Sequence, residues 1–469
     1  MTIEQEQKLV FKIADLLKEN KDLTNQLKDV SELNRKIKKQ NEKLENIITS
    51  LPPELVPKEA GRSVNNKTKR FEMATVLFAD IQGFKKIAEQ AGTSEVIDEL
   101  DQIIFHFNSI VKKYKIEKIK TIGDAYMCAG GVPEKNITNP IDVVLAALEM
   151  QDYLYKLKVE YEKNNKKFWD LKMGIHTGPV TATFSGRKKI SYELKGDNVN
   201  IATRMASAGE VSQINISIMT YELVKQYFVC DYNGKIPVKY KGDMEMYFLK
   251  RIKPAYSNDR KIGKKANQIF WNKYLLRQFT DLQEIILDKL EKELPSYLYY
   301  HNFKHTIDVI NQAELIGYGE GVDDESILLL KTAALFHDAG HIIAYDEHEY
   351  HGTNFAKEYL PQFNYTDEQI ERICELIMAT KLPPDPQNTL ESIMCDSDLD
   401  YLGRSDFIPV SNTLFKELKE QNKIGSLNDW NKIQVMFLSK HQFFTKTGKN
   451  LREVNKQMQI ERIKSLIEV

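Results

Sequence analysis

The first fifty residues repeat their apolar positions at alternating steps of four and three residues. The stripe consists of Leu9, Ile13, Leu16, Asn20, Leu23, Leu27, Val30, Asn34, Ile37, Asn41, Leu44, Ile48 and Leu51. This spacing keeps one helix face toward a partner helix, and its three asparagines at a positions favour two parallel strands. An amphipathic helix packed on its own domain is the alternative, but such helices carry a wider apolar stripe. We therefore predict a parallel dimeric coiled coil over residues 1–51, ended by Pro52 and Pro53.

Length and charge narrow the class of protein further. A chain of 469 residues exceeds what one hydrophobic core usually organises, so several domains are expected. The 66 basic and 67 acidic residues balance, which argues against a nucleic-acid partner. The sequence shows neither a membrane-spanning apolar stretch nor a secretory signal, and its four cysteines are dispersed. We expect a soluble, cytoplasmic protein that does not bind membranes.

The remainder of the chain divides into two linkers and two domains. Residues 52–70 read as a linker. In residues 71–252 short β-branched runs alternate with helical patterns, which predicts an α+β sheet domain. Residues 253–265 are rich in charge and turn residues, and residues 266–469 show helical periodicity throughout. The predicted fold is therefore multidomain, with a coiled coil, an α+β domain and an all-α domain.

Two aspartates follow predicted strands of the α+β domain. Asp80 ends a β-branched run and precedes a glycine turn, and Asp124 lies in a strand–turn–strand segment. Taken singly, each fits an ordinary turn residue. If adjacent strands bring them together, the two carboxylates suit a hard divalent cation.

Three segments of this domain resemble the catalytic domain of class III adenylyl and guanylyl cyclases. They are FADIQGF from residue 78, KTIGDAY from residue 120 and GDNVNIATRM from residue 196. The resemblance implies a ferredoxin-like fold in which two protomers of a homodimer share each active site. It also implies closure of a nucleoside triphosphate to a cyclic nucleotide at a pair of Mg²⁺ or Mn²⁺ ions.

The resemblance assigns the metal and transition-state roles. Asp80 and Asp124 would hold the two ions, helped by the backbone carbonyl of Ile81. Asn200 and Arg204 would come from the opposite protomer. Because they are four residues apart on one predicted helix, they share a face, so Asn200 could orient the ribose while Arg204 stabilises the charged phosphorus.

The resemblance also assigns substrate recognition. Lys118 and Lys241 match the positions that bind the triphosphate, with Lys239 as the substitute for Lys241. Lys120 and Glu193 match the positions that choose the base. A lysine can donate to N1 of adenine, where guanine carries its own N–H, so Lys120 favours ATP and cyclic AMP. Adenylyl members usually carry Asp or Thr at the position of Glu193, which leaves cyclic GMP as an alternative. A cross-strand ion pair of Lys120 and Glu193 is another interpretation.

Histidines cluster in the helical region. Six of the nine lie between His301 and His351, and further acids follow in the segment Cys395-Asp396-Ser397-Asp398. A lone histidine on a helix is usually structural, but histidines grouped with aspartates at these spacings suit a metal pair.

This region resembles the HD-domain metal phosphohydrolases, and its segment from Tyr300 resembles that of cyclic nucleotide phosphodiesterases. The divalent-metal ligands implied are His305, His337, Asp338 and Asp398, with Asp396 as the fallback for the last. His301 would be the general acid for the departing ribose oxygen, a role that needs a group titrating near neutrality. Further ligands or supporting groups would be His341, His348 and His351.

Together the resemblances predict an adenylate cyclase joined to a hydrolase of cyclic AMP. The alternatives are that the HD domain is a nucleotide-binding sensor or acts on another phosphoester. A chain that ran both reactions freely would only consume ATP, so we expect one activity to be gated.

Overall fold

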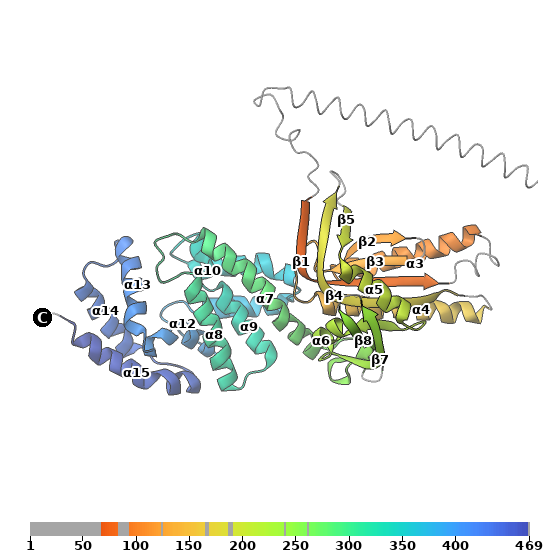
Figure 1. Cartoon of the computed structure of the whole chain (residues 1–469). Coiled ribbons are helices and arrows are strands. Elements are labelled where there is room, and N and C mark those ends of the chain that lie inside the picture. The colour runs from red at the N-terminus through yellow and green to blue at the C-terminus, as the bar shows by residue number, and fades with distance from the viewer. Residues whose placement is uncertain are drawn as a thin grey trace, which may run out of the picture. The chain divides into compact units, whose positions relative to one another are not determined.

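The computed structural model describes residues 67–82, 93–122, 125–164, 168–185, 191–238, 241–259 and 262–467 (Figure 1). The predicted coiled coil lies outside the described residues and stays a prediction. In these described ranges no helix is long and apolar enough to cross a membrane.

A mixed sheet forms the centre of the first domain. Its described strands are β1 (Lys67–Gln82), β2 (Glu117–Ile122), β3 (Ala125–Gly130), β4 (Asp170–Ser185), β5 (Ser191–Lys195), β6 (Ile214–Ser217), β7 (Phe228–Val238) and β8 (Gly242–Ile252). Their order is β2-β3-β1-β4-β6-β8-β7, and β5 pairs with β4. β4 and β6 run parallel, whereas β3 is antiparallel to both of its neighbours and β8 to both of its own. The sheet is therefore mixed, with β1 and β4 in its interior.

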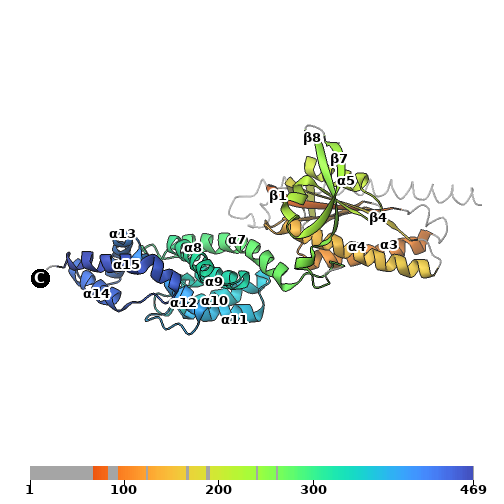
Figure 2. The same cartoon turned by 90° about the horizontal axis from the view of Figure 1, so that it is seen from below.

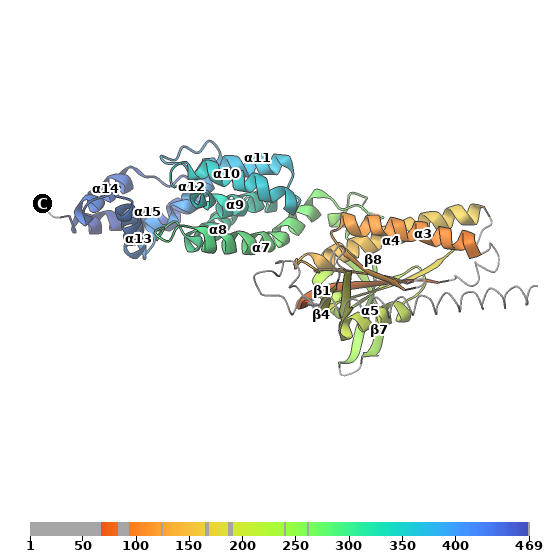
Figure 3. The same cartoon turned by 90° about the horizontal axis from the view of Figure 1, so that it is seen from above.

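Two long helices cover one face of this sheet. α3 (Thr93–Lys113) and α4 (Asn139–Lys163) lie side by side there in the views of Figures 2 and 3. The first half of α4 is buried almost all round, and Phe107 of α3 is fully buried with it. This burial of apolar side chains forms the main core of the domain. A short helix, α6 (Ile218–Val224), follows β6.

Helix α5 (Asp197–Ala208) lies on the other side of the sheet and approaches β4 very closely. A Cβ atom on Gly174 of β4 would lie 2.1 Å from the backbone nitrogen of Ala206, so only glycine fits there. The apolar face of α5, including Ile201 and Met205, packs against Val238 and other residues of the β7–β8 hairpin. α5 is thus held between the sheet and this hairpin.

The second domain is helical. Its described helices are α7 (Gln268–Glu293), α8 (Phe303–Glu320), α9 (Asp324–Phe336), α10 (His348–Tyr359), α11 (Asp367–Met378), α12 (Thr389–Asp398), α13 (Phe407–Glu420), α14 (Leu427–Lys440) and α15 (Lys446–Lys464), with short 3₁₀ turns η2 (Ala339–Ile342), η3 (Leu360–Phe363) and η4 (Asp400–Gly403). α9 is central, because nearly all of its side chains from Ile327 onward are buried. Helices α13 to α15 gather at the C-terminal end around a separate small core (Figure 2).

The expected sheet domain of helices and strands, predicted as α+β, has a mixed sheet, and the helical region after it is confirmed. The sequence patterns succeeded here because β-branched runs and helical periodicity reflect which faces are buried.

We predict that Gly174→Ala destabilises the sheet domain by roughly 1–3 kcal/mol, because the new methyl group meets the backbone of α5. The first thermal unfolding transition should fall by roughly 2–12 °C, measured by circular dichroism. Gly425→Ala is the matched control, since its nearest atom is a carboxylate oxygen of the Asp429 side chain, 3.3 Å away. Equal melting of the Gly174 variant and wild type would contradict this packing.

Candidate functional site

The first predicted site begins at the end of β1. Asp80 is partly buried there, and its Oδ2 accepts a hydrogen bond of 2.9 Å from Gln82 Nε2. The register of β1 against β3 pairs Asp80 with Ala125, so the chain that follows residue 124 lies beside this carboxylate. Asp124 itself lies outside the described residues. Its pairing with Asp80 around two metal ions remains a prediction.

Further predicted substrate residues lie on α5 and beside the β7–β8 hairpin. Asn200 and Arg204 are both exposed on the polar face of α5. Arg204 Nη1 donates to the carbonyl oxygen of Pro237 at 3.1 Å, which ties the helix to the hairpin. Lys241, at the start of β8, is also exposed. The substitute Lys239 lies outside the described residues, so the choice between the two lysines stays open.

The predicted base-recognition residues lie on different strands. Lys118 and Lys120 are exposed on β2, where the register shifts between them. Glu193 of β5 forms an ion pair of 3.2 Å with Lys195. β2 pairs with β3, and β5 pairs with β4, so these two strands are not neighbours. The alternative of a cross-strand pair between Lys120 and Glu193 is therefore wrong within this protomer.

The second predicted site is a group of histidines and aspartates in the helical domain. His305 on α8, His337 after α9 and Asp398 at the end of α12 bring their ligand atoms within 4.8 Å of one another. His305 Nε2 lies 3.1 Å from Asp398 Oδ1, and His337 Nε2 lies 3.4 Å from the same oxygen. His337 Nδ1 is 2.8 Å from the carbonyl oxygen of Ala334 and donates to it. This hydrogen bond turns Nε2 toward the two carboxylates, the position from which a neutral His337 would face a cation.

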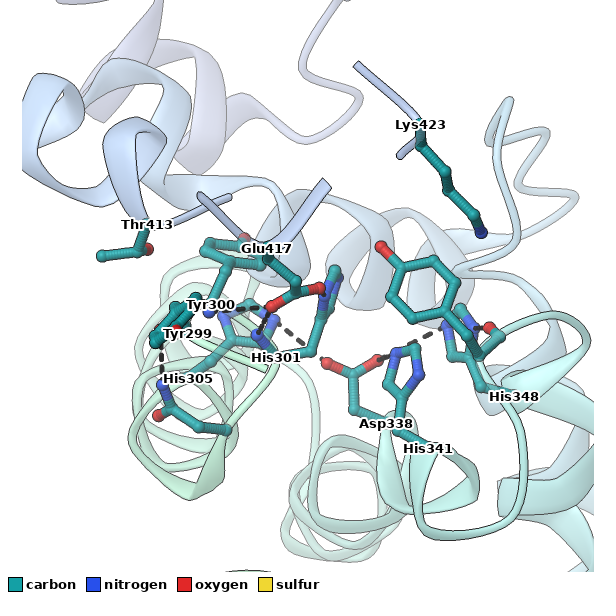
Figure 4. Close-up of polar contacts among 12 residues, drawn as sticks. Tyr299, Tyr300, His301, His305, Asp338, His341, His348, Thr413, Glu417 and Lys423 are labelled. Carbon is teal, nitrogen blue, oxygen red and sulfur yellow. Dashed lines mark hydrogen bonds and ion pairs between the residues drawn. The ribbon is translucent and has the colours of Figure 1, made fainter. Parts of the chain in front are cut away.

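Asp338 lies between two groups of imidazoles (Figure 4). Its Oδ2 is 3.3 Å from His337 Nε2 and 3.5 Å from His305 Nε2. Its Oδ1 is 3.5 Å from His348 Nε2 and 3.9 Å from His341 Nε2. Oδ2 is buried and has no hydrogen-bond partner among the described residues. An orphaned carboxylate oxygen among imidazole nitrogens fits divalent cations, and these residues could hold a pair of them.

Electrostatics keeps these carboxylates ionised. Burial raises the pKa of Asp338, but the positive charge of the neighbouring imidazoles, that of His337 first, outweighs burial and holds its pKa well below the ordinary value. Burial likewise opposes ionisation of Asp398, and hydrogen bonds from His305 and His337 lower its pKa overall. For His341, burial lowers the pKa to about 2, so this ring stays neutral. Ionised carboxylates and a neutral imidazole are the forms that bind metals.

His301 has a partner that the sequence did not reveal. Its Nδ1 lies 2.5 Å from Oε1 of Glu417 on α13, and the other oxygen of Glu417 accepts from the backbone N–H groups of Tyr300 and His301. Burial lowers the pKa of His301, but the hydrogen bond to Glu417 and the charge of Asp338 raise it above the ordinary value. One sign of this partner was present in the sequence, since Glu417 is a charged residue on the apolar face of α13, three positions after Leu414.

The remaining candidates are separated from these groups. Asp396 is fully buried, and its carboxylate accepts hydrogen bonds from the backbone N–H groups of Phe444 and Thr445 and from the Thr445 hydroxyl. It therefore anchors the start of α15, and Asp398 is the aspartate beside the histidines. His351 belongs to neither group of potential ligands, and its ring lies against Tyr350.

A cavity of about 500 Å³ opens beside His301 and Asp338. One part of its wall is apolar and comes from the C-terminal helices, with Phe407, Leu414, Trp430, Phe437 and Leu438 among the lining residues; another part is polar and comes from residues 345–349 and Lys381. This volume suits a small molecule, and the lining suits one with a polar and an apolar end.

Two family models match the chain. The adenylate and guanylate cyclase catalytic domain matches residues 66–251, and the HD domain matches residues 302–400. Receptor-type guanylate cyclase gcy-8 of Caenorhabditis elegans is 36% identical over 215 residues, which are 45% of this chain and 18% of that protein. Guanylate cyclase 32E of Drosophila melanogaster is 35% identical over 193 residues, 40% of this chain and 16% of that protein. The chain thus spans less than a quarter of the length of these relatives.

Among solved structures, the guanylate cyclase domain of RhGC from Catenaria anguillulae in complex with GTP is similar to part of the chain. It is 31% identical, and the match covers 39% of this chain and 100% of that domain with a TM-score of 0.35.

The two neighbouring aspartates of α12 give opposite predictions. Asp398→Asn should lower Mn²⁺ affinity at least about 10–100-fold, because an ionised ligand is lost. Asp396→Asn should retain Mn²⁺ but melt at a lower temperature, because its new amide N–H groups oppose backbone N–H donors. Bound Mn²⁺ is measured after dialysis, with Asp80→Ala in every protein to weaken the other site. Loss of Mn²⁺ in the Asp396 variant alone would reverse the assignment.

Proposed function

Because residues 66–251 are a class III cyclase catalytic domain and residues 302–400 an HD domain, we propose that this chain both makes and destroys a cyclic nucleotide. The first reaction converts ATP to 3',5'-cyclic AMP and pyrophosphate. The second hydrolyses cyclic AMP to 5'-AMP. The observation that carries the second activity is the convergence of His305, His337, Asp338 and Asp398 beside His301 and its partner Glu417.

In the first reaction the ribose 3'-oxygen attacks the α-phosphorus, and pyrophosphate leaves. Divalent ions held by Asp80 and Asp124 would screen the phosphate charge and make the 3'-hydroxyl more acidic. Cyclase domains act as dimers on nucleotides, so Asn200 and Arg204 of one protomer complete the site of the other. Only Nη1 of Arg204 is bonded to Pro237, which leaves other guanidinium N–H groups for phosphate oxygens.

The choice of ATP rests on Lys120, whose ammonium can donate to N1 of adenine. It is exposed on β2 and has no ion pair among the described residues. A specific observation favours GTP as the second candidate, since the curated relatives named above are guanylate cyclases. Glu193 forms an exposed ion pair with Lys195, a weak contact that a nucleotide could displace, so this pair does not decide between the two bases.

In the second reaction water attacks phosphorus, and the bond from phosphorus to the ribose 3'-oxygen breaks. Divalent ions held by the four ligands would supply an acidified water and neutralise the phosphate. His301 gives a proton to the departing 3'-oxygen, while its Nδ1 stays bonded to Glu417, which fixes the ring. The apolar wall of the cavity, including Phe407 and Trp430, suits the flat nucleobase.

We predict that Asp80→Ala and Arg204→Ala are each inactive as cyclases and recover activity when mixed. One of the two sites in a mixed dimer then contains both wild-type halves, so activity should approach half of wild type. Cyclic nucleotide formation from ATP and from GTP is measured after subunit exchange, which two affinity tags verify. Each variant mixed with itself is the control, and inactive mixed dimers would contradict shared sites.

The Asp338→Ala and His301→Ala variants of the full chain should separate hydrolysis from cyclisation. Asp338→Ala should accumulate cyclic nucleotide where wild type also yields the 5'-monophosphate, because the cations are no longer held. His301→Ala should keep its bound metal while hydrolysis falls by roughly 10²–10⁴-fold. Products from ATP and GTP are followed by chromatography. If wild type and Asp338→Ala give equal cyclic nucleotide and no monophosphate, the HD domain is a sensor or acts on another phosphoester.

A further inference from the structure

His176 is a buried histidine of the sheet domain to which the proposed reaction assigns no role. It lies in β4 and is 1% exposed. Both ring nitrogens have partners, since Nδ1 lies 2.7 Å from Ser217 Oγ and Nε2 lies 2.9 Å from Asn198 Oδ1. An imidazole held at both nitrogens has a fixed orientation.

The partners also fix its protonation. The Nδ2 group of Asn198 donates to the carbonyl oxygen of Pro179, which shows that the other end of the amide, facing His176, is Oδ1. An amide oxygen only accepts hydrogen bonds. His176 therefore donates from Nε2, and its Nδ1 accepts from the Ser217 hydroxyl. Burial lowers the pKa of His176 to about 4, so the ring is neutral at ordinary pH.

Asn198 links this histidine to a predicted substrate residue. Its Oδ1 accepts a second hydrogen bond of 2.9 Å from Nζ of Lys241. The amide has little room to move, because a Cβ atom on Gly178 would lie only 2.8 Å from its Cγ. Asn198 is also 5% exposed on the first turn of α5, two residues before Asn200. One amide thus sets the position of the lysine and secures the start of the helix.

We propose that His176 is a positioning residue for the cyclase reaction, which holds the Asn198 amide so that Lys241 is presented to the triphosphate. The inference rests on the proposed cyclase function. A lysine that contacts the triphosphate before and during reaction contributes uniform binding, so its misplacement raises KM and leaves kcat nearly unchanged. A neutral donor suits this place, because a charged imidazole would repel the ammonium group of Lys241.

Two substitutions separate the two ring nitrogens. The amide nitrogen of glutamine reaches about as far as Nε2, whereas that of asparagine reaches only about as far as Nδ1. His176→Asn should therefore lose the hydrogen bond to Asn198 and raise KM for the triphosphate by roughly 5- to 30-fold. His176→Gln should retain most of the wild-type affinity. Steady-state kinetics of the full chain with ATP and GTP measures both.

A double-mutant cycle with Lys241→Ala distinguishes positioning from general damage. If His176 acts through Lys241, His176→Asn adds little to the KM of Lys241→Ala, whereas independent effects multiply. An unchanged KM in His176→Asn, or multiplied effects in the double variant, would overturn the inference. Asn198→Ala repeats the cycle if His176→Asn melts below the assay temperature.

The affinity for fluorescent N-methylanthraniloyl ATP and GTP provides a measurement that needs no turnover. If wild type makes no cyclic nucleotide, the proposed function fails. The same double-mutant cycle, measured by the binding of these nucleotides, still decides the role of His176. Weaker binding in His176→Asn, restored in His176→Gln, supports it. Equal binding in both variants and wild type rejects it.

Discussion

The helical domain depends on one carboxylate that is withdrawn from water. Asp338 is 6% exposed, and a charge at such depth requires opposite charge or cations around it. Its imidazole neighbours come from α8, the end of α9, η2 and α10, so these elements must approach one another closely. Gly340 makes this possible, because a Cβ atom there would lie 1.9 Å from the carbonyl oxygen of His348. A glycine without chemistry of its own thereby allows α10 to bring His348 to the cluster.

In the sheet domain, too, a glycine allows two elements to approach closely around buried polar groups, but these groups are neutral. Gly174 lets α5 lie against β4, and the helix then buries Asn198 while it leaves Asn200 and Arg204 exposed. Hydrogen bonds continue from His176 through Ser217 and a row of threonine hydroxyls to Asn139 at the start of α4. Because each of these buried hydroxyls and amides has a partner, the network adds rigidity without an unpaired polar group. The exposed face of α5 therefore belongs to a helix whose buried side is held in place by hydrogen bonds.

The sequence revealed the groups that lie close together along the chain and missed those that do not. His301, His305, His337 and Asp338 belong to short segments with recognisable spacing, whereas Glu417 is 116 residues from the histidine that it contacts. Asp396 and Asp398 could not be told apart, because two residues on a helix point about 200° apart and only the packing of α12 shows which side faces the histidines. His176 gave no signal, since an apolar strand with one histidine reads as ordinary core. Asp124, Lys239 and the coiled coil lie outside the described residues and stay predictions.

The two domains show that a histidine takes its role from its partner. His301 and His176 are both buried, and burial alone lowers the pKa of each. Glu417 reverses that effect for His301, because a buried carboxylate favours the protonated ring, and a protonated ring can serve as an acid. Asn198 and Ser217 offer His176 only a neutral acceptor and a hydroxyl donor, so this ring stays uncharged. Its hydrogen bonds then serve to orient its partners. Replacing Glu417 by a neutral residue would therefore remove the influence that makes His301 a proton donor, even though His301 itself remained unchanged.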